Sequence, residues 1–95
     1  MQWVPELRQL RAFVAIVEEG SFTLAARKIH VTQSAVSHSL RALEEQMDCS
    51  LLDRSSRRVV PTAEGELLLV RCRRMLHEID QVARDLEGLR RWGQS

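Results

Sequence analysis

The chain has 95 residues, 44% of them hydrophobic and 28% charged, with a formal net charge of +1. This length suits one small domain and leaves little room for a catalytic domain with a deep cleft, so we expect a binding module without enzymatic activity and without a cofactor. Because no apolar run approaches the roughly 18 residues of a membrane span and the first residues do not resemble a secretion signal, we expect no membrane partner and a cytoplasmic location.

The first predicted element is an amphipathic helix over about residues 5–18. Its apolar side chains recur at helical spacing and share one face: Leu7, Leu10, Phe13, Val14 and Val17. Gly20 is predicted to end this helix, because glycine readily adopts the left-handed conformation found after helix ends. Ser21 then caps a second, short helix over residues 22–29.

A third predicted helix begins after the N-cap residue Thr32 and runs to about residue 47. Its inward stripe has steps of four, three and four, formed by Val36, Leu40, Leu43 and Met47. Short polar side chains point outward from its first two turns: Gln33, Ser34, Ser37 and His38. These residue types form helices less readily than Glu, Lys or Ala, so a helix selected for stability alone would not carry them. An ordinary capped surface helix is the alternative.

The second and third predicted helices together favour a helix-turn-helix motif. Ala25 and Ala26 are small enough for close helix packing, and Val36, ten residues after Ala26, suits the buried anchor of the following helix. This motif lays its second helix in the major groove of DNA, where glutamine bonds adenine bidentately and serine bonds bases or phosphates. We therefore expect the helix from Thr32 to face DNA.

A β-hairpin is predicted over residues 51–60, with short strands at 51–53 and 58–60 around a polar turn. Arg54, Arg57 and Arg58 lie within five residues of one another. A basic hairpin beside a recognition helix can lie along phosphates or enter the minor groove. A hairpin tip that is only solvated is the alternative.

The last predicted element is a long helix over residues 62–91, with Thr62 as its N-cap and an acidic residue in its first turn. At 1.5 Å per residue this helix extends roughly 45 Å, which is longer than is needed to pack against a compact body formed by the rest of the chain. Apolar residues in a four-three pattern line one face: Leu68, Cys72, Met75, Ile79, Val82, Leu86 and Leu89. This pattern is typical of a helix pair, so we predict a homodimer through this face. The predicted division is a body at 1–61 and a linker and dimerisation helix at 62–95.

Residues 7–65 resemble the N-terminal domain of the LysR-type transcriptional regulators, a family of bacterial winged helix-turn-helix proteins. The resemblance rests on segments in register: Phe13, Gly20-Ser21-Phe22, Ala25-Ala26, VTQSAVS at 31–37, Leu43-Glu44, LLDR at 51–54 and PTAEG at 61–65. It implies a mainly α fold, a winged helix-turn-helix with a three-helix body and a short β-hairpin wing, followed by a long helix that pairs two chains. Two positions depart from the family, Asp48 where it usually has glycine and Leu52 where it usually has phenylalanine.

The resemblance also implies a DNA-binding surface. The implied contact residues lie on the recognition helix, the wing and the start of the last helix: Thr32, Gln33, Ser34, Ser37, His38, Arg41, Arg54, Arg57, Arg58 and Thr62. The expected partner is double-stranded DNA with a pseudo-palindromic promoter site, bound by a homodimer and read for transcription regulation. A small-molecule effector is expected only through a further domain of the family, outside the present sequence.

Other kinds of site find little support in the sequence. No metal site is expected, because no two of His30, His38 and His77 have the spacing that aims two imidazoles at one ion. Cys49 and Cys72 are expected to be reduced packing residues. A winged-helix protein-interaction module, which recruits a partner through the long amphipathic helix, is the alternative function. Salt-sensitive binding of ordinary genomic DNA distinguishes the two.

Overall fold

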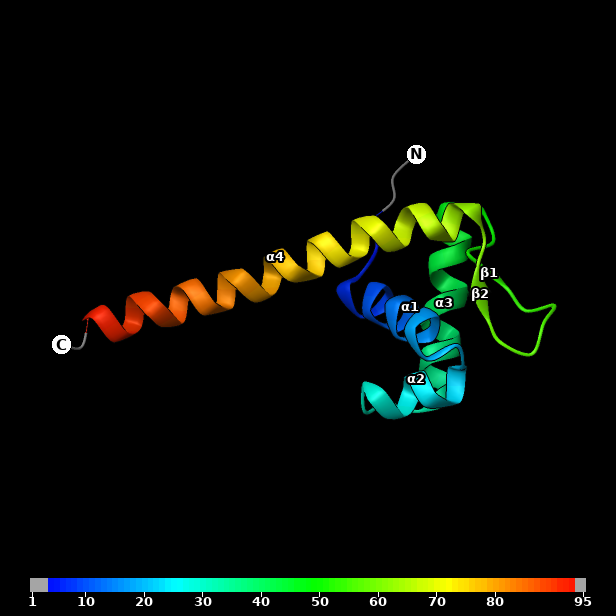
Figure 1. Cartoon of the computed structure of the whole chain (residues 1–95), viewed down its shortest axis with the longest axis horizontal. Helices are drawn as coiled ribbons and strands as arrows, with labels where there is room; N and C mark the ends of the chain where they lie inside the picture. Colours follow the sequence, from blue (N-terminus) through cyan, green and yellow to red (C-terminus); the bar gives the residue numbers. More distant parts are fainter. Residues whose placement is uncertain (1–3, 94–95) are drawn as a thin grey trace.

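The computed structural model describes residues 4–93 (Figure 1). Along this range the chain forms α1 (Leu7–Glu19), α2 (Phe22–Lys28), α3 (Gln33–Met47), β1 (Leu52–Asp53), β2 (Val60–Pro61) and α4 (Ala63–Gly93). The first three helices form a body with the two-stranded antiparallel sheet at one side, and α4 extends far beyond it (Figure 1). The predicted mainly helical architecture is confirmed. Residues 1–3, at the start of the predicted 1–61 body, and residues 94–95, at the end of the predicted 62–95 helix segment, lie outside the described residues.

The ends of α1 differ slightly from the prediction. The helix begins at Leu7 rather than residue 5, because Glu6 has an extended backbone and its N–H donates to Gln9 Oε1 at 2.9 Å. It ends at Glu19, one residue later than predicted. Gly20 follows with a left-handed φ of 68°, and its N–H donates to the Ile16 carbonyl oxygen at 2.8 Å, which confirms it as the helix end.

A tight turn joins α2 to α3. The Ser21 hydroxyl accepts the N–H three residues ahead at 3.2 Å, and the Thr32 hydroxyl does the same at 3.1 Å, so both predicted N-caps are confirmed. α2 ends at Lys28, one residue before the predicted end. His30 then takes a left-handed φ of 60°, which turns the chain sharply into α3.

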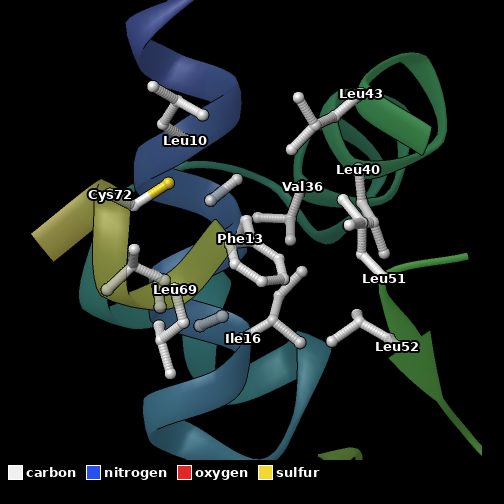
Figure 2. Close-up of a cluster of buried hydrophobic side chains, with 14 of the residues drawn as sticks. Leu10, Phe13, Ile16, Val36, Leu40, Leu43, Leu51, Leu52, Leu69 and Cys72 are labelled. Atoms are coloured by element: carbon white, nitrogen blue, oxygen red, sulfur yellow. The ribbon is translucent and has the colours of Figure 1, made fainter. Parts of the chain in front are cut away.

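The hydrophobic core lies where α1, α3, the start of α4 and β1 meet (Figure 2). Its largest fully buried side chains are Phe13, Ile16, Val36, Leu40, Leu43, Leu51 and Cys72. Ala25 and Ala26 of α2 are buried as well, and they lie in the same cluster as Val36. Small residues in α2 thus let it pack closely against α3, as the sequence predicts.

The hairpin is shifted relative to the prediction. Leu52 pairs with Pro61 and Asp53 with Val60, so the second strand lies at 60–61 instead of 58–60. The reason is that the Val59 N–H donates to the Gly20 carbonyl oxygen at 3.2 Å, across to the α1–α2 corner. The segment before β2 is therefore bonded to the body and not to β1.

α4 begins at Ala63 after its predicted N-cap, Thr62, whose hydroxyl accepts the Gly65 N–H at 3.1 Å. The early turns of α4 pack on the body, where Cys72 is completely buried. The prediction that Cys72 belongs to a dimer seam is therefore wrong, because this side chain is already covered by its own chain. Among the described residues beyond position 76, none of α4 is buried.

Two glycines of α4 provide a matched test of this packing. A Cβ at Gly65 would lie 2.1 Å from the Leu51 carbonyl oxygen, whereas a Cβ at Gly88 would meet nothing within 4 Å. Gly65→Ala should lower the free energy of unfolding by about 1–3 kcal/mol because the backbone of the wing must move. Gly88→Ala should raise it by about 1 kcal/mol through helix propensity. Urea denaturation at one fixed protein concentration measures both variants. The same change in unfolding free energy for both would contradict the close approach of Gly65 to the Leu51 carbonyl oxygen.

Candidate nucleic-acid interface

The outward side of α3 carries a continuous row of polar side chains. Five of the predicted contact residues line one shallow, open hollow on this helix: Gln33, Ser34, Ser37, His38 and Arg41. Val36 points the other way and is 1% exposed, so burial of this one residue fixes which face is free. The row combines an amide, two hydroxyls, an imidazole and a guanidinium, and therefore offers both donors and acceptors.

The N-terminal end of α3 adds backbone donors to this row. Thr32 is exposed and caps the helix through its hydroxyl, which accepts the Ala35 N–H. The first turn of a helix carries N–H groups without intrahelical partners and the positive end of the helix dipole. This end of α3 is thus suited to an anionic oxygen such as that of a phosphate.

The three predicted wing arginines have different surroundings. Arg54 places its guanidinium 4.6 Å from the centre of the Phe22 ring, a cation–π arrangement that ties the hairpin to α2. Arg58 Nη2 donates to the Glu18 carbonyl oxygen at 3.4 Å and crosses close to Gly20. Arg57 makes no hydrogen bond or ion pair with any residue in the range 4–93. Of the three, Arg57 is the one whose charge is not engaged within the chain.

Thr62 has a structural role in this chain. Its hydroxyl donates to the Ser50 carbonyl oxygen at 2.7 Å and accepts the Gly65 N–H at 3.1 Å. A hydroxyl has one proton to donate, and that proton is used here. The predicted membership of Thr62 in the contact set therefore gains no support from its geometry.

One side chain beside the α3 row is not predicted by the sequence pattern. Thr23 of α2 donates its hydroxyl to Gln33 Oε1 at 3.2 Å. The two residues are ten positions apart and come from different helices, so no periodicity within either helix relates them. The presence of a hydroxyl in the first turn of α2 was the available signal, but its partner depends on how α2 packs on α3.

An ion-pair cluster centred on Glu18 joins helices other than α3. Glu18 contacts Lys28 Nζ at 2.8 Å and Arg73 Nη2 at 3.7 Å, and so links α1 to both α2 and α4. The hydrogen bond to Glu18 raises the pKa of Lys28, with the charge of Glu19 adding to the effect. The charge of Lys28 is thus engaged within the body and not part of the α3 row.

Neither cysteine has the environment of a reactive thiol. Burial raises the pKa of Cys49, and the carboxylates of Glu64, Glu44 and Asp48 raise it further. Burial raises the pKa of Cys72 to about 11. Reactive thiols need the opposite, a lowered pKa that favours the thiolate.

A second exposed surface lies along α4. An apolar groove, here called the α1–α4 groove, is lined by Pro5, Leu10, Met47, Cys49, Leu51, Glu64, Leu67, Leu68, Arg71 and Met75. Farther along the helix lies a bare stripe whose members are 41–69% exposed: Ile79, Val82, Leu86 and Leu89. Large apolar side chains in such a contiguous exposed row mark a surface for association. No helix within residues 4–93 is long and apolar enough to cross a membrane.

Comparison with known proteins places the chain in a family. The family model described as the bacterial regulatory helix-turn-helix protein, lysR family, matches residues 7–66. The chain is 45% identical over 84 residues to the HTH-type transcriptional regulator PgrR of Escherichia coli (strain K12), and the matched region covers 88% of this chain and 28% of PgrR. It is 49% identical over 71 residues to the SDS degradation transcriptional activation protein of a Pseudomonas species, which covers 75% of the chain and 23% of that protein.

The fold agrees with these similarities. The crystal structure of the BenM DBD/catB site 1 DNA complex matches with a TM-score of 0.85 and 40% identity, over 88% of this chain and 93% of that one. The chain spans about a quarter of the length of PgrR and of the SDS degradation activator. With the family model matched over α1 to the start of α4, and with the helices and the wing in the expected order, the chain belongs to the LysR family of bacterial regulatory helix-turn-helix proteins.

Proposed function

We propose that this chain is the sequence-specific DNA-binding part of a LysR-type transcriptional regulator, with α3 lying in the major groove. The observation that carries this proposal is the polar row of α3, which is exposed along one face while Val36 is buried behind it. The similar BenM chain was crystallised as a DNA complex, which supports the same partner for this chain. Residues 1–61 then form the DNA-reading body, and residues 62–95 the linker and dimerisation helix.

Different residues of this surface recognise bases and bind phosphates. Gln33, Ser34 and Ser37 reach base edges, because amide and hydroxyl groups match the donor and acceptor pattern of the major groove. The Thr32 end of α3 and Arg57 of the wing contact phosphates, which adds affinity without sequence preference. Arg54 and Arg58 hold the wing against the body through Phe22 and the α1–α2 corner.

The functional unit is a homodimer formed through α4. In an antiparallel pair of α4 helices centred near Ile79, the bare stripe of each copy lies on the α1–α4 groove of the other. Charge favours this direction, because the first turn of α4 carries Glu64 and Glu66 and the last turn carries Arg90 and Arg91. An antiparallel pair brings these opposite charges together, whereas a parallel pair opposes like charges. Two recognition helices then read a pseudo-palindromic site.

The rest of the regulator lies beyond this sequence in the proposed scheme. Its relatives are transcriptional regulators, and we infer a non-enzymatic role in the bacterial cytoplasm, where promoter DNA is found. An effector would act through another domain.

The competing function is a protein-interaction module that uses only the surface of α4. Gel shifts with genomic DNA at low and moderate salt distinguish the two functions. Only a DNA-binding protein should shift the DNA, and its affinity should fall steeply as the salt concentration rises.

Arg57 provides a test of the phosphate contact. Arg57→Ala should reduce the slope of log affinity against log salt by about one unit for each bound copy, because one arginine–phosphate contact is lost. Arg84→Ala removes an exposed arginine of α4 and should leave the slope unchanged. Fluorescence anisotropy over a salt series measures both variants. An unchanged slope in Arg57→Ala would remove Arg57 from the interface.

Gln33 provides the complementary test of base reading. Gln33→Ala should cost about 1–3 kcal/mol on the preferred duplex, with no change in salt slope, because the lost contact is to a base and not to a phosphate. Affinity for a random duplex should stay the same. Equal losses on preferred and random duplexes would show that Gln33 does not read sequence.

Val82 tests the dimer. Val82→Asp should convert the protein from dimer to monomer at tens of micromolar, because it puts a charge in the bare stripe without touching the body. Val70→Asp is a matched control, since Val70 is similarly exposed, at 51% against 55%, and lies roughly 140° around the helix from Met75. Sedimentation equilibrium separates the outcomes, and circular dichroism verifies that both variants are folded. A dimer that survives Val82→Asp rules out this interface.

A further inference from the structure

The side chain of Gln33 is held from outside its own helix. Thr23 Oγ1 donates to Gln33 Oε1 at 3.2 Å, and both residues are exposed on the same side of the body. Thr23 lies in the first turn of α2, and Gln33 is the first residue of α3. The pair therefore bridges the two helices of the motif at the start of the polar row.

The backbones that carry this pair are well fixed. α2 is held against the core by Ala25 and Ala26, both at most 5% exposed, and α3 by Val36, which is 1% exposed. The Thr32 cap fixes the first turn of α3 directly before Gln33. The hydrogen bond between the two side chains thus joins two helices that the core holds in place.

The bond has a chemical consequence for Gln33. A glutamine amide has one acceptor end and one donor end, and bidentate pairing with adenine needs both, the oxygen for N6–H and the nitrogen for N7. The Thr23 hydroxyl turns Oε1 toward α2 and occupies one of its two lone pairs, so the end of the amide that faces away from α2 is the Nε2 amino group, which only donates. A donor fits guanine best, because guanine presents two acceptors, N7 and O6, in the major groove.

We propose that Thr23 is a specificity-positioning residue, which orients the Gln33 amide so that this helix reads guanine in place of adenine. This inference rests on the proposed DNA-binding function and deepens it. Thr23 acts through Gln33 and needs no contact with DNA of its own. It also replaces the bidentate adenine contact that the sequence alone suggests for Gln33.

The test begins with selection of bound sequences from a random duplex pool by the whole chain. The position that loses its base preference in Gln33→Ala is the one that Gln33 reads. At that position the wild type should prefer guanine. Thr23→Val keeps the shape and removes the hydroxyl, and it should reduce the preference for guanine over adenine by roughly tenfold. Thr23→Ser keeps the hydroxyl and should retain the preference.

The outcomes separate this inference from the proposed function. A wild type that enriches no sequence overturns DNA reading itself and this inference with it. A wild type that enriches a site in which Gln33→Ala alters no position leaves DNA reading intact and overturns the role of Gln33. A wild-type preference for adenine, or an unchanged guanine preference in Thr23→Val, overturns the role of Thr23. Thermal unfolding of the Val and Ser variants, expected to match the wild type, shows that a lost preference is not a folding defect.

Discussion

Phe13 and Ile16 of α1 are fully buried where α3, α4 and the wing meet, and the arrangement of every other element depends on this contact (Figure 2). Burying such side chains contributes about 1.5–3 kcal/mol each. Because α1 contacts α2, α3 and α4, it fixes the angle between the recognition helix and the long helix. The direction in which the polar row of α3 faces and the direction in which α4 leaves the body therefore both depend on this apolar contact.

Hydrogen bonding within the chain determines which polar groups remain for a ligand. The Thr62 hydroxyl and the Arg58 guanidinium are engaged in the chain's own contacts, whereas Arg57 and most of the α3 row face solvent. A group that is already satisfied gains less from a phosphate than a free one, because binding must first break the existing bond. This distinction explains why charge alone is a poor guide to the interface in a chain of net charge +1.

α4 has two functions along one helix. Its early turns complete the core through Leu69 and Cys72, and its later turns carry the bare stripe. Because one continuous helix carries both parts, pairing of the bare stripes of two copies would also fix the distance between their α3 helices. A few short polar side chains can read only a few base pairs, so in the proposed dimer a fixed spacing between the two copies is as important as the contacts of each.

The sequence by itself determined the helices, their caps and the family, because helical periodicity, residues such as Ser21, Thr32 and Gly20, and the motif order are local properties of the chain. It also predicted which face of α3 is exposed, since Val36 belongs to a regular apolar stripe. Only the tertiary structure decided the hairpin register, the burial of Cys72 and the bond between Thr23 and Gln33. Each of these depends on the distance between elements far apart in the sequence, and periodicity within one element contains no information about that distance.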